Sequence, residues 1–172
     1  DPFQSIVSRL YGHLDAKEYS EAADCFASLK ETDALTMYSE YQYAMVLNIL
    51  HRGDDCIAII LPWLEENKGK SLTLDYWMYD ALGDCYANKG DKVSAIRYYE
   101  EAVSTYCRMF NTTEKEIRKN KFQDETLGYT LYDLALQYAS TDIRKTYYYA
   151  SLAAKSGNAA AIDYCKKANI RF

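Results

Sequence analysis

The sequence predicts an all-α fold built from antiparallel helical hairpins, and three observations lead to this prediction. Only seven Gly and two Pro occur among 172 residues, so few positions interrupt long helices. Apolar and small residues recur at helical spacing from Tyr76 to Cys107, on both sides of a turn at Asn88 to Asp91. Comparable helix–turn–helix patterns occur upstream at intervals of 36 and 37 residues, as expected of a helical repeat.

The N-terminal half predicts two such hairpins, over residues 3–36 and 39–70. In the first, Phe3 to Leu14 form one helix, and a second helix begins near Tyr19 and contains Ala22 and Phe26. In the second hairpin, Ala58 is expected in the close-packed position that Ala22 has in the first. The turn before it is placed at Gly53 and Asp54, with Asp54 or Asp55 as the helix cap.

The third hairpin, over residues 76–110, has the clearest pattern. Gly90 can adopt the left-handed conformation that ends a helix, and Asp91 can cap the N-terminus of the next one. The small residues Gly83, Ala95 and Ala102 allow two helices to approach closely, and tyrosines fill the space around that contact. This segment therefore predicts a tightly packed pair of helices.

The same residues resemble the signature of the tetratricopeptide repeat (TPR) family, which runs aromatic, Leu-Gly, Tyr, then Ala, aromatic, Ala. The matching positions are Tyr79, Leu82, Gly83, Tyr86, Ala95, Tyr99 and Ala102. Where the family usually has Pro, this chain has Cys107, which suggests that the second helix continues past its usual end. The resemblance implies a right-handed α-α superhelix, a TPR-like solenoid formed by one domain over residues 1–172.

After the third hairpin the period breaks, because the next Leu-Ala-Tyr pattern begins only at Leu134. An insertion over about 111–125 accounts for the extra length, and within it Thr113 and Glu116 can form a capping box. The insertion either forms a short extra helix or lengthens its neighbours. A fourth hairpin is expected over 128–157, followed by a terminal capping helix over about 158–170. The stretch from Tyr147 to Ala159 resembles the Sel-like relatives of the TPR.

Composition argues against several classes of function. The net charge is −5 and the basic residues are scattered, whereas nucleic-acid binding needs clustered Lys and Arg. No stretch has the roughly 20 apolar residues of a membrane helix. The five cysteines are odd in number and form no C-x-x-C pair, which favours free thiols and slightly favours the cytoplasm. The chain starts at Asp1, so a removed leader peptide also fits.

No motif predicts catalysis, a metal site or a cofactor. His13 and His51 lie near the ends of helices in different hairpins and have no ligand spacing around them. Cys85 lies inside the best-matched hairpin and is expected in the core. We therefore expect neither an enzyme nor a metalloprotein.

If the hairpins stack as in the TPR family, their first helices line a concave groove that holds a partner peptide or helix. The family's groove positions correspond to a set of mostly aromatic and acidic residues: Tyr11, Tyr43, Leu47, Trp77, Asp80, Asp84, Tyr129, Tyr132 and Leu136. Such a groove favours apolar peptides, or peptides that contain Tyr, Pro, Lys or Arg. The alternative for each aromatic residue is packing between repeats.

Three hypotheses of function follow from the sequence. The first is a non-catalytic protein–protein interaction scaffold whose partner the sequence does not identify. The second is a structural homo-oligomer or a subunit of a larger assembly. The third is a small-molecule binder or enzyme that uses Cys or His in the groove.

Overall fold

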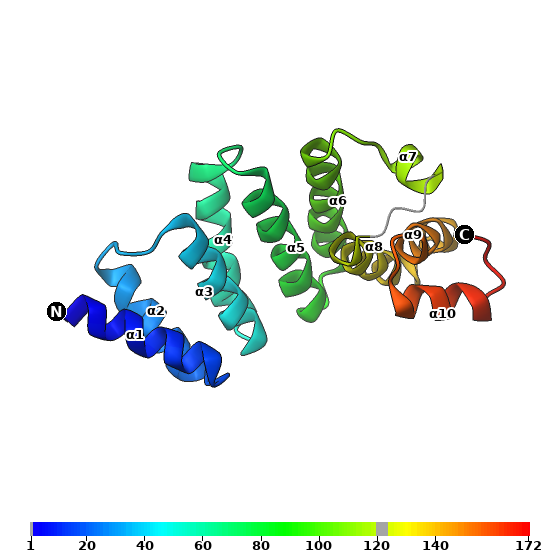
Figure 1. Cartoon of the computed structure of the whole chain (residues 1–172). Helices are drawn as coiled ribbons and strands as arrows, with labels where there is room; N and C mark the ends of the chain where they lie inside the picture. The colour runs from blue at the N-terminus through cyan, green and yellow to red at the C-terminus, as the bar shows by residue number, and fades with distance from the viewer. Residues whose placement is uncertain (1, 120–123) are drawn as a thin grey trace. The chain divides into compact units, whose positions relative to one another are not determined.

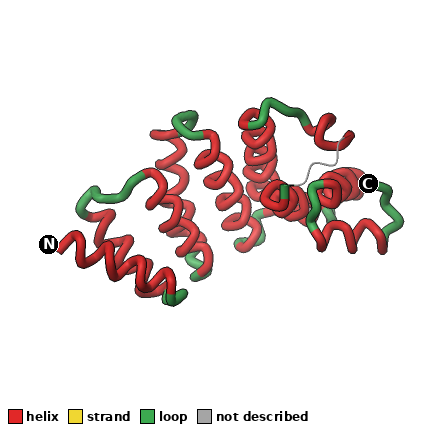
Figure 2. The backbone as a smooth tube through the Cα atoms, viewed as in Figure 1, coloured by secondary structure: helices red, strands yellow, loops and turns green. Residues whose placement is uncertain are grey.

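The computed structural model describes residues 2–119 and 124–172, and all regular structure in these ranges is helical (Figure 2). Figure 1 labels the helices, whose bounds are α1 Pro2–Asp15, α2 Tyr19–Glu31, α3 Met37–Ile49, α4 Gly53–Asn67, α5 Leu72–Asn88, α6 Lys92–Met109, α7 Glu114–Lys119, α8 Glu125–Tyr138, α9 Ile143–Lys155 and α10 Ala159–Lys167. Residues 120–123 of the predicted insertion, and Asp1, lie outside the described residues. The prediction of an all-α fold is confirmed.

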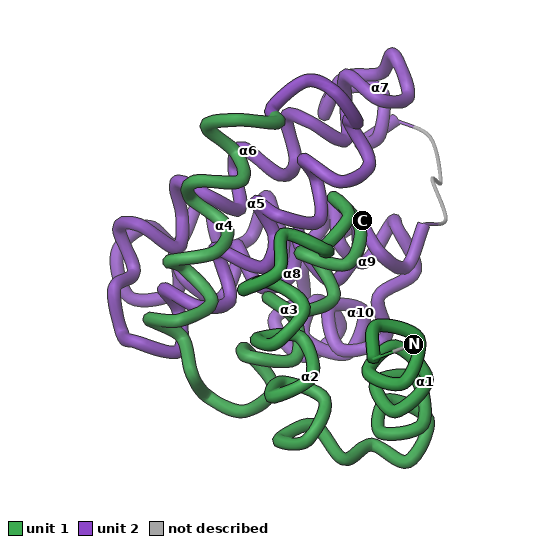
Figure 3. The backbone as a smooth tube through the Cα atoms, turned by 90° about the vertical axis from the view of Figure 1, so that its left-hand side faces the viewer, with its two compact units in different colours: residues 1–67 green, residues 68–172 purple. Residues whose placement is uncertain are grey.

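The helices form two compact units, residues 1–67 and 68–172, which Figure 3 colours separately. In the first unit, α1 packs against α2, α2 against α3, and α3 against α4. In the second unit, α5 packs against α6, α6 against α8, α8 against α9, and α9 against both α7 and α10. Apart from α7, which packs against α9 and not against the helices next to it in the chain, consecutive helices are therefore neighbours within each unit, as helical hairpins require.

Polar caps define where most of these helices begin. A side-chain oxygen of the residue before the helix accepts a hydrogen bond from a backbone N–H of the first turn, which would otherwise lack a partner. The capping residues are Thr36 for α3, Ser71 for α5, Asp91 for α6, Asp124 for α8, Asp142 for α9 and Asn158 for α10. The predicted cap at Asp91 is thus confirmed.

A left-handed turn joins the two helices of a hairpin, and it recurs along the chain. Lys17, His51, Gly90 and Gly157 all have positive φ angles, and each lies two residues before the next helix. The residue after each of them donates its N–H to the carbonyl five positions earlier, at 2.8 Å for Arg52 to Leu47 and 2.9 Å for Asp91 to Tyr86. This is the hydrogen bond of the Schellman motif, which ends a helix.

The turn geometry corrects the expected register of the second hairpin. His51 has the left-handed conformation of Gly90, and Gly53 is already the first residue of α4. Cys56 is consequently the buried residue that corresponds to Ala95, whereas Ala58 is exposed. The placement of Ala58 in the close-packed position is therefore wrong, as is the placement of the turn at Gly53 and Asp54.

The third hairpin packs as its sequence predicts. Gly83, Ala95 and Ala102 are buried, and the ring of Tyr99 fills the space beside Gly83. Cys85 is fully buried, as expected. Of the five free cysteines, only Cys107 keeps intermediate exposure.

The described part of the insertion contains a separate short helix, α7. Its start is a capping box in which the Glu116 N–H donates to Thr113 Oγ1 at 3.2 Å, and the Thr113 N–H donates to Glu116 Oε2 at 3.0 Å. Ile117 is buried and anchors the helix where it packs on α9. The predicted capping box is confirmed, and of the two alternatives the short extra helix is the one observed.

Candidate functional site

The predicted groove residues of the first unit have different environments. Tyr11 on α1 is exposed, at 57%. Tyr43 on α3 is buried and its ring stacks on Phe26 of α2, with the ring centroids 5.3 Å apart. Leu47 is fully buried. Tyr43 and Leu47 therefore contribute to packing between α2 and α3, which is the alternative that the sequence left open, and Leu47 has no surface to offer a partner.

In the second unit, the predicted residues of α5 form a stripe along the part of the helix that stays accessible. Trp77, Asp80 and Asp84 follow one another at spacings of three and four residues, and each keeps intermediate exposure. The residues between them, including Met78 and Leu82, are buried in the core of the unit. This side of α5 is therefore acidic with one large aromatic residue.

The predicted residues of α8 are mostly accessible as well. Tyr129 is 63% exposed and Leu136 is 46% exposed. Tyr132 has intermediate exposure and lies beside Tyr164 of α10, with the ring centroids 6.4 Å apart. Tyr129 and Leu136 are thus exposed apolar side chains, whereas part of the Tyr132 ring is covered by the terminal helix.

Hydrogen bonds between side chains join the acidic stripe of α5 to α8 and α6. Thr130 Oγ1 of α8 donates to Asp80 Oδ1 at 2.6 Å, and the hydroxyl of Tyr76 lies 2.7 Å from the same Thr130 oxygen. On the other side, the hydroxyl of Tyr99 on α6 donates to Asp84 Oδ1 at 2.6 Å. These bonds hold both carboxylates in defined positions.

A third carboxylate, Asp133 of α8, belongs to the same cluster. Burial, together with the charge of Asp84, raises the pKa of Asp133 from 3.8 to about 6. Burial and the charges of Asp84 and Asp133 raise the pKa of Asp80 to about 7, against the opposing effect of the Thr130 hydrogen bond. The pKa of Asp84 is also raised, mainly by burial. We call Asp80, Asp84 and Asp133 the acidic cluster.

The acidic cluster lacks a balancing cation within the described residues. None of its three carboxylates forms an ion pair with Lys, Arg or His there. The described residues also contain no group of three or more His, Cys, Asp or Glu side chains placed to hold a metal ion. The cluster therefore concentrates negative charge at a partly buried surface, an environment that favours a cationic group supplied from outside.

Asp133 was not predicted from the sequence. The resemblance gives groove positions on each helix separately, and Asp133 lies beside Tyr132 but one position, or about 100°, further around α8. Its proximity to Asp84, which lies 49 positions earlier in the chain, depends on how α8 packs. The sequence signal is that Asp133 is a charged residue within the otherwise apolar run from Leu131 to Leu136.

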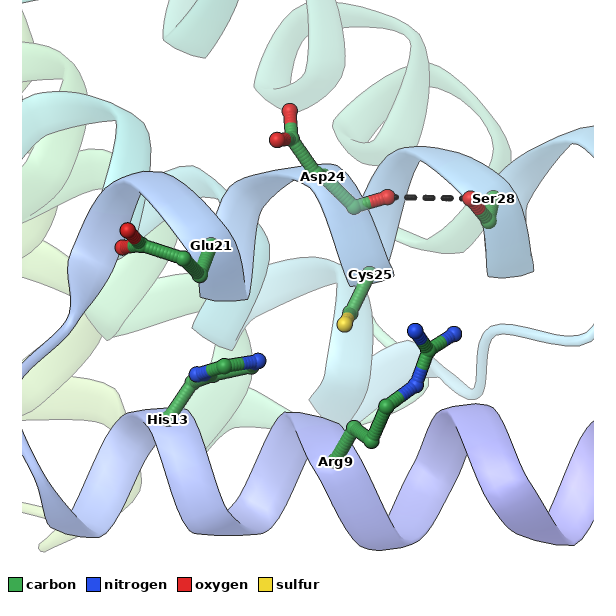
Figure 4. A pocket seen from close by; sticks show the side chains of 6 residues that line it. All are labelled: Arg9, His13, Glu21, Asp24, Cys25 and Ser28. Atoms are coloured by element: carbon green, nitrogen blue, oxygen red, sulfur yellow. Dashed lines mark hydrogen bonds between the residues drawn. The ribbon is translucent and has the colours of Figure 1, made fainter.

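A concave feature lies between α1 and α2 in the first unit, with a volume of about 300 Å³ (Figure 4). Arg9 and His13 extend from α1, and the thiol of Cys25 points toward them from α2. His13 Nδ1 lies 2.6 Å from Glu18 Oε2, so this nitrogen is engaged by a carboxylate. Cys25 is buried, and no described hydrogen bond joins its thiol to a base, so the arrangement lacks the contact that activates a nucleophilic cysteine.

No protein-family model matches the chain, and no curated protein is significantly similar to it. Within residues 2–119 and 124–172, no helix combines the length and the apolar character needed to cross a membrane.

Proposed function

We propose that this protein is a non-catalytic interaction scaffold of the TPR type, and that the α5–α8 face of its second unit binds a basic segment of a partner protein. The observation that carries the proposal is the acidic cluster, whose three carboxylates from two helices have no balancing cation among the described residues. A Lys or Arg side chain would supply the missing charge.

The energetic argument starts from the raised pKa values of the cluster. Carboxylates that are hard to ionise destabilise the folded protein at neutral pH, so an acidic cluster of this kind lowers stability unless something else offsets it. A bound cation favours the ionised forms and releases this unfavourable energy. Charge-assisted hydrogen bonds to a partly buried carboxylate are also stronger than those made on an open surface.

The aromatic side chains on the same two helices supply apolar contact area. Trp77 precedes Asp80 by one helical turn on α5, and Tyr129 and Leu136 are exposed on α8. Aromatic residues at the centre of an interface commonly carry much of its binding energy. A segment that combines a basic side chain with apolar or aromatic neighbours therefore fits this face best.

The superhelical repeat is part of the same proposal. In the third hairpin, Gly83 meets the ring of Tyr99, as the TPR signature requires. Near the C-terminus, Ala153 and Ala154 are buried and Gly157 is left-handed, which suits the Sel-like pattern. These local features support a solenoid in which first helices such as α5 and α8 line the binding groove.

The test is a crosslinking pull-down from native extract that compares the wild type with the triple variant Trp77→Ala, Asp80→Asn, Asp84→Asn. Asn keeps an oxygen that can accept the hydrogen bonds from Thr130 and Tyr99, so the variant removes charge with little change in packing. We expect specific partners to be lost and the remaining binding to become less sensitive to salt.

A matched control removes one aromatic ring and two carboxylates elsewhere in the second unit, by Tyr147→Ala, Glu101→Gln and Asp163→Asn, all at exposed positions. The control should retain the partners. If both variants retain them, the α5–α8 face is not the binding site. If the wild type captures only copies of itself, the structural homo-oligomer replaces the scaffold.

A further inference from the structure

A cavity of about 410 Å³ opens in the second unit, at the N-terminal end of α5, away from Asp84. Four aromatic side chains contribute to its wall: Tyr76 and Trp77 of α5, Tyr106 of α6, and Phe110, which follows α6. Met109, Asp124 and two threonines, Thr73 and Thr126, also line the cavity. We call this the aromatic pocket, and its volume lies within the range of small-ligand sites.

The rings present faces and edges at several angles. The centroids of Tyr76 and Tyr106 are 5.7 Å apart with an interplanar angle of 63°, and those of Tyr106 and Phe110 are 4.6 Å apart at 40°. Tyr76 and Tyr106 are almost completely buried, so they form the floor, whereas Trp77 and Phe110 retain accessible surface at the rim. Ring faces carry negative electrostatic potential and attract cations.

A single carboxylate gives the aromatic pocket its charge. Asp124 Oδ1 caps α8 by accepting from the N–H groups of Thr126 and Leu127, and Oδ2 accepts from the hydroxyl of Tyr106 at 2.8 Å. These three bonds hold the carboxylate in place and use three of its roughly four acceptor positions. None of the described residues that line the cavity is Lys, Arg or His.

Aromatic rings beside a hydrogen-bonded carboxylate favour some cations over others. A primary ammonium group has three N–H donors that need acceptors to replace water, whereas Asp124 already accepts three hydrogen bonds and can accept about one more. A methylated ammonium group has few or no N–H donors, is weakly hydrated, and gains from both ring faces and a nearby negative charge. We propose that the aromatic pocket binds a methylated ammonium group, carried either by a free quaternary ammonium compound or by a methylated lysine side chain. The inference does not depend on the binding of a basic peptide to the acidic cluster.

The test uses the wild-type chain labelled with ¹³C at the methionine methyl groups. Met109 lines the pocket, whereas Met37 and Met45 lie in the first unit and serve as internal controls. Choline is titrated beside its uncharged isostere 3,3-dimethylbutan-1-ol, which has the same shape. We expect the Met109 methyl signal to shift with choline, and the isostere to bind about tenfold more weakly because it lacks the cation–π and charge terms.

Two variants separate charge from shape. Asp124→Asn keeps an acceptor for the cap of α8 but removes the charge, so choline should bind about as weakly as the isostere. Trp77→Leu removes one ring and should weaken choline binding without affecting folding, because Trp77 is only partly buried. Tryptophan fluorescence gives a second readout in the wild type, with Trp63 of the first unit as a constant background.

A peptide that bears trimethyllysine and its unmodified counterpart distinguish the two sources. If only the modified peptide shifts Met109, the ligand is a methylated lysine; if choline does so as well, a free compound also fits the pocket. Equal affinity for choline and its isostere would overturn the proposal, because the pocket would then be merely apolar. The absence of any Met109 shift with both choline and the trimethyllysine peptide would also overturn it.

Discussion

A Cβ atom placed on Gly83 of α5 would lie only 2.4 Å from Cδ1 of the Tyr99 ring on α6. α5 and α6 can therefore pack at their observed spacing only because position 83 has no side chain. The Tyr99 ring cannot easily move aside, since its hydroxyl is held by Asp84 Oδ1 at 2.6 Å. This contact fixes the spacing between α5 and α6.

Gly83→Ala should consequently lower the free energy of unfolding by about 1–3 kcal/mol through overpacking, despite the higher helix propensity of Ala. Urea denaturation monitored by circular dichroism measures the change. The control is Gly12→Ala on α1, where a Cβ atom meets nothing within 4 Å. That variant should be neutral or gain up to about 1 kcal/mol. Equal effects of the two substitutions would show that the close contact does not limit packing.

Stability should depend on pH through the acidic cluster. The folded pKa values of Asp80 and Asp133 are about 7 and about 6, above the ordinary value of 3.8. Between about pH 4 and pH 7 the folded protein keeps protons that the unfolded chain has released, so these groups lower the free energy of unfolding as pH rises through this window. Above about pH 7 both carboxyl groups are ionised in the folded protein, and they lower the free energy of unfolding by a constant amount.

Asp80→Asn should therefore stabilise the protein at pH 8 by about 1–2 kcal/mol, and the gain should shrink toward pH 5, where Asp80 is already protonated. Urea denaturation of both proteins across this range gives the difference directly. Asp163→Asn on α10 is the control, because Asp163 forms an exposed pair with Lys167. If Asp80→Asn stabilised the protein equally at pH 5 and pH 8, the raised pKa of Asp80 would be contradicted.

The left-handed turns predict effects of opposite sign at two equivalent positions. His51 has φ 58°, a conformation that is strained for a residue with a Cβ atom, whereas Gly90 has φ 79°. His51→Gly should raise the free energy of unfolding by about 0.5–1 kcal/mol, and Gly90→Ala should lower it by about 1 kcal/mol. Changes of the same sign in thermal or urea unfolding would show that the two turns are not equivalent.

The short helix α7 should depend on one buried side chain for its position. Ile117 is almost fully buried, and Tyr148 of α9 adds a hydrogen bond from its hydroxyl to Glu114 Oε2 at 2.8 Å. Ile117→Ala removes the apolar anchor, so the free energy of opening α7 should fall by about 2–4 kcal/mol. Amide hydrogen exchange of residues 114–119 should then accelerate.

The control for α7 is Lys119→Ala, at an exposed position of the same helix. It should leave the exchange rates of α7 almost unchanged. If Ile117→Ala had no more effect than this control, the contact with α9 would not determine the position of α7.

The local sequence was sufficient to predict those features that depend on residues close together in the chain. The caps at Asp91 and Thr113, the left-handed Gly90 and the contact of Gly83 with Tyr99 all follow from short-range patterns of small, aromatic and polar residues. Such patterns are readable because each residue type has a distinct conformational or hydrogen-bonding requirement. The helical content and the hairpin order rest on the same signals.

The register of the second hairpin could not be derived in this way. Its left-handed residue is His51, a residue type that signals this conformation only weakly, and α4 offers apolar residues on several sides. Whether Cys56 or Ala58 faces the core is decided by which side of α4 packs against α3, and that side is set by contacts between helices.

That the protein is helical, where most of its helices pair, and that Trp77, Asp80 and Asp84 lie along one side of α5 could all be derived from the amino-acid sequence. The packing of the helices was needed to show that Asp133 joins Asp80 and Asp84, that Tyr43 and Leu47 are buried, and that four aromatic residues and Asp124 line a cavity. These features depend on residues that are far apart in the chain. Charge repulsion, burial and enclosure arise between residues many positions apart, and these effects exist only once the helices have packed.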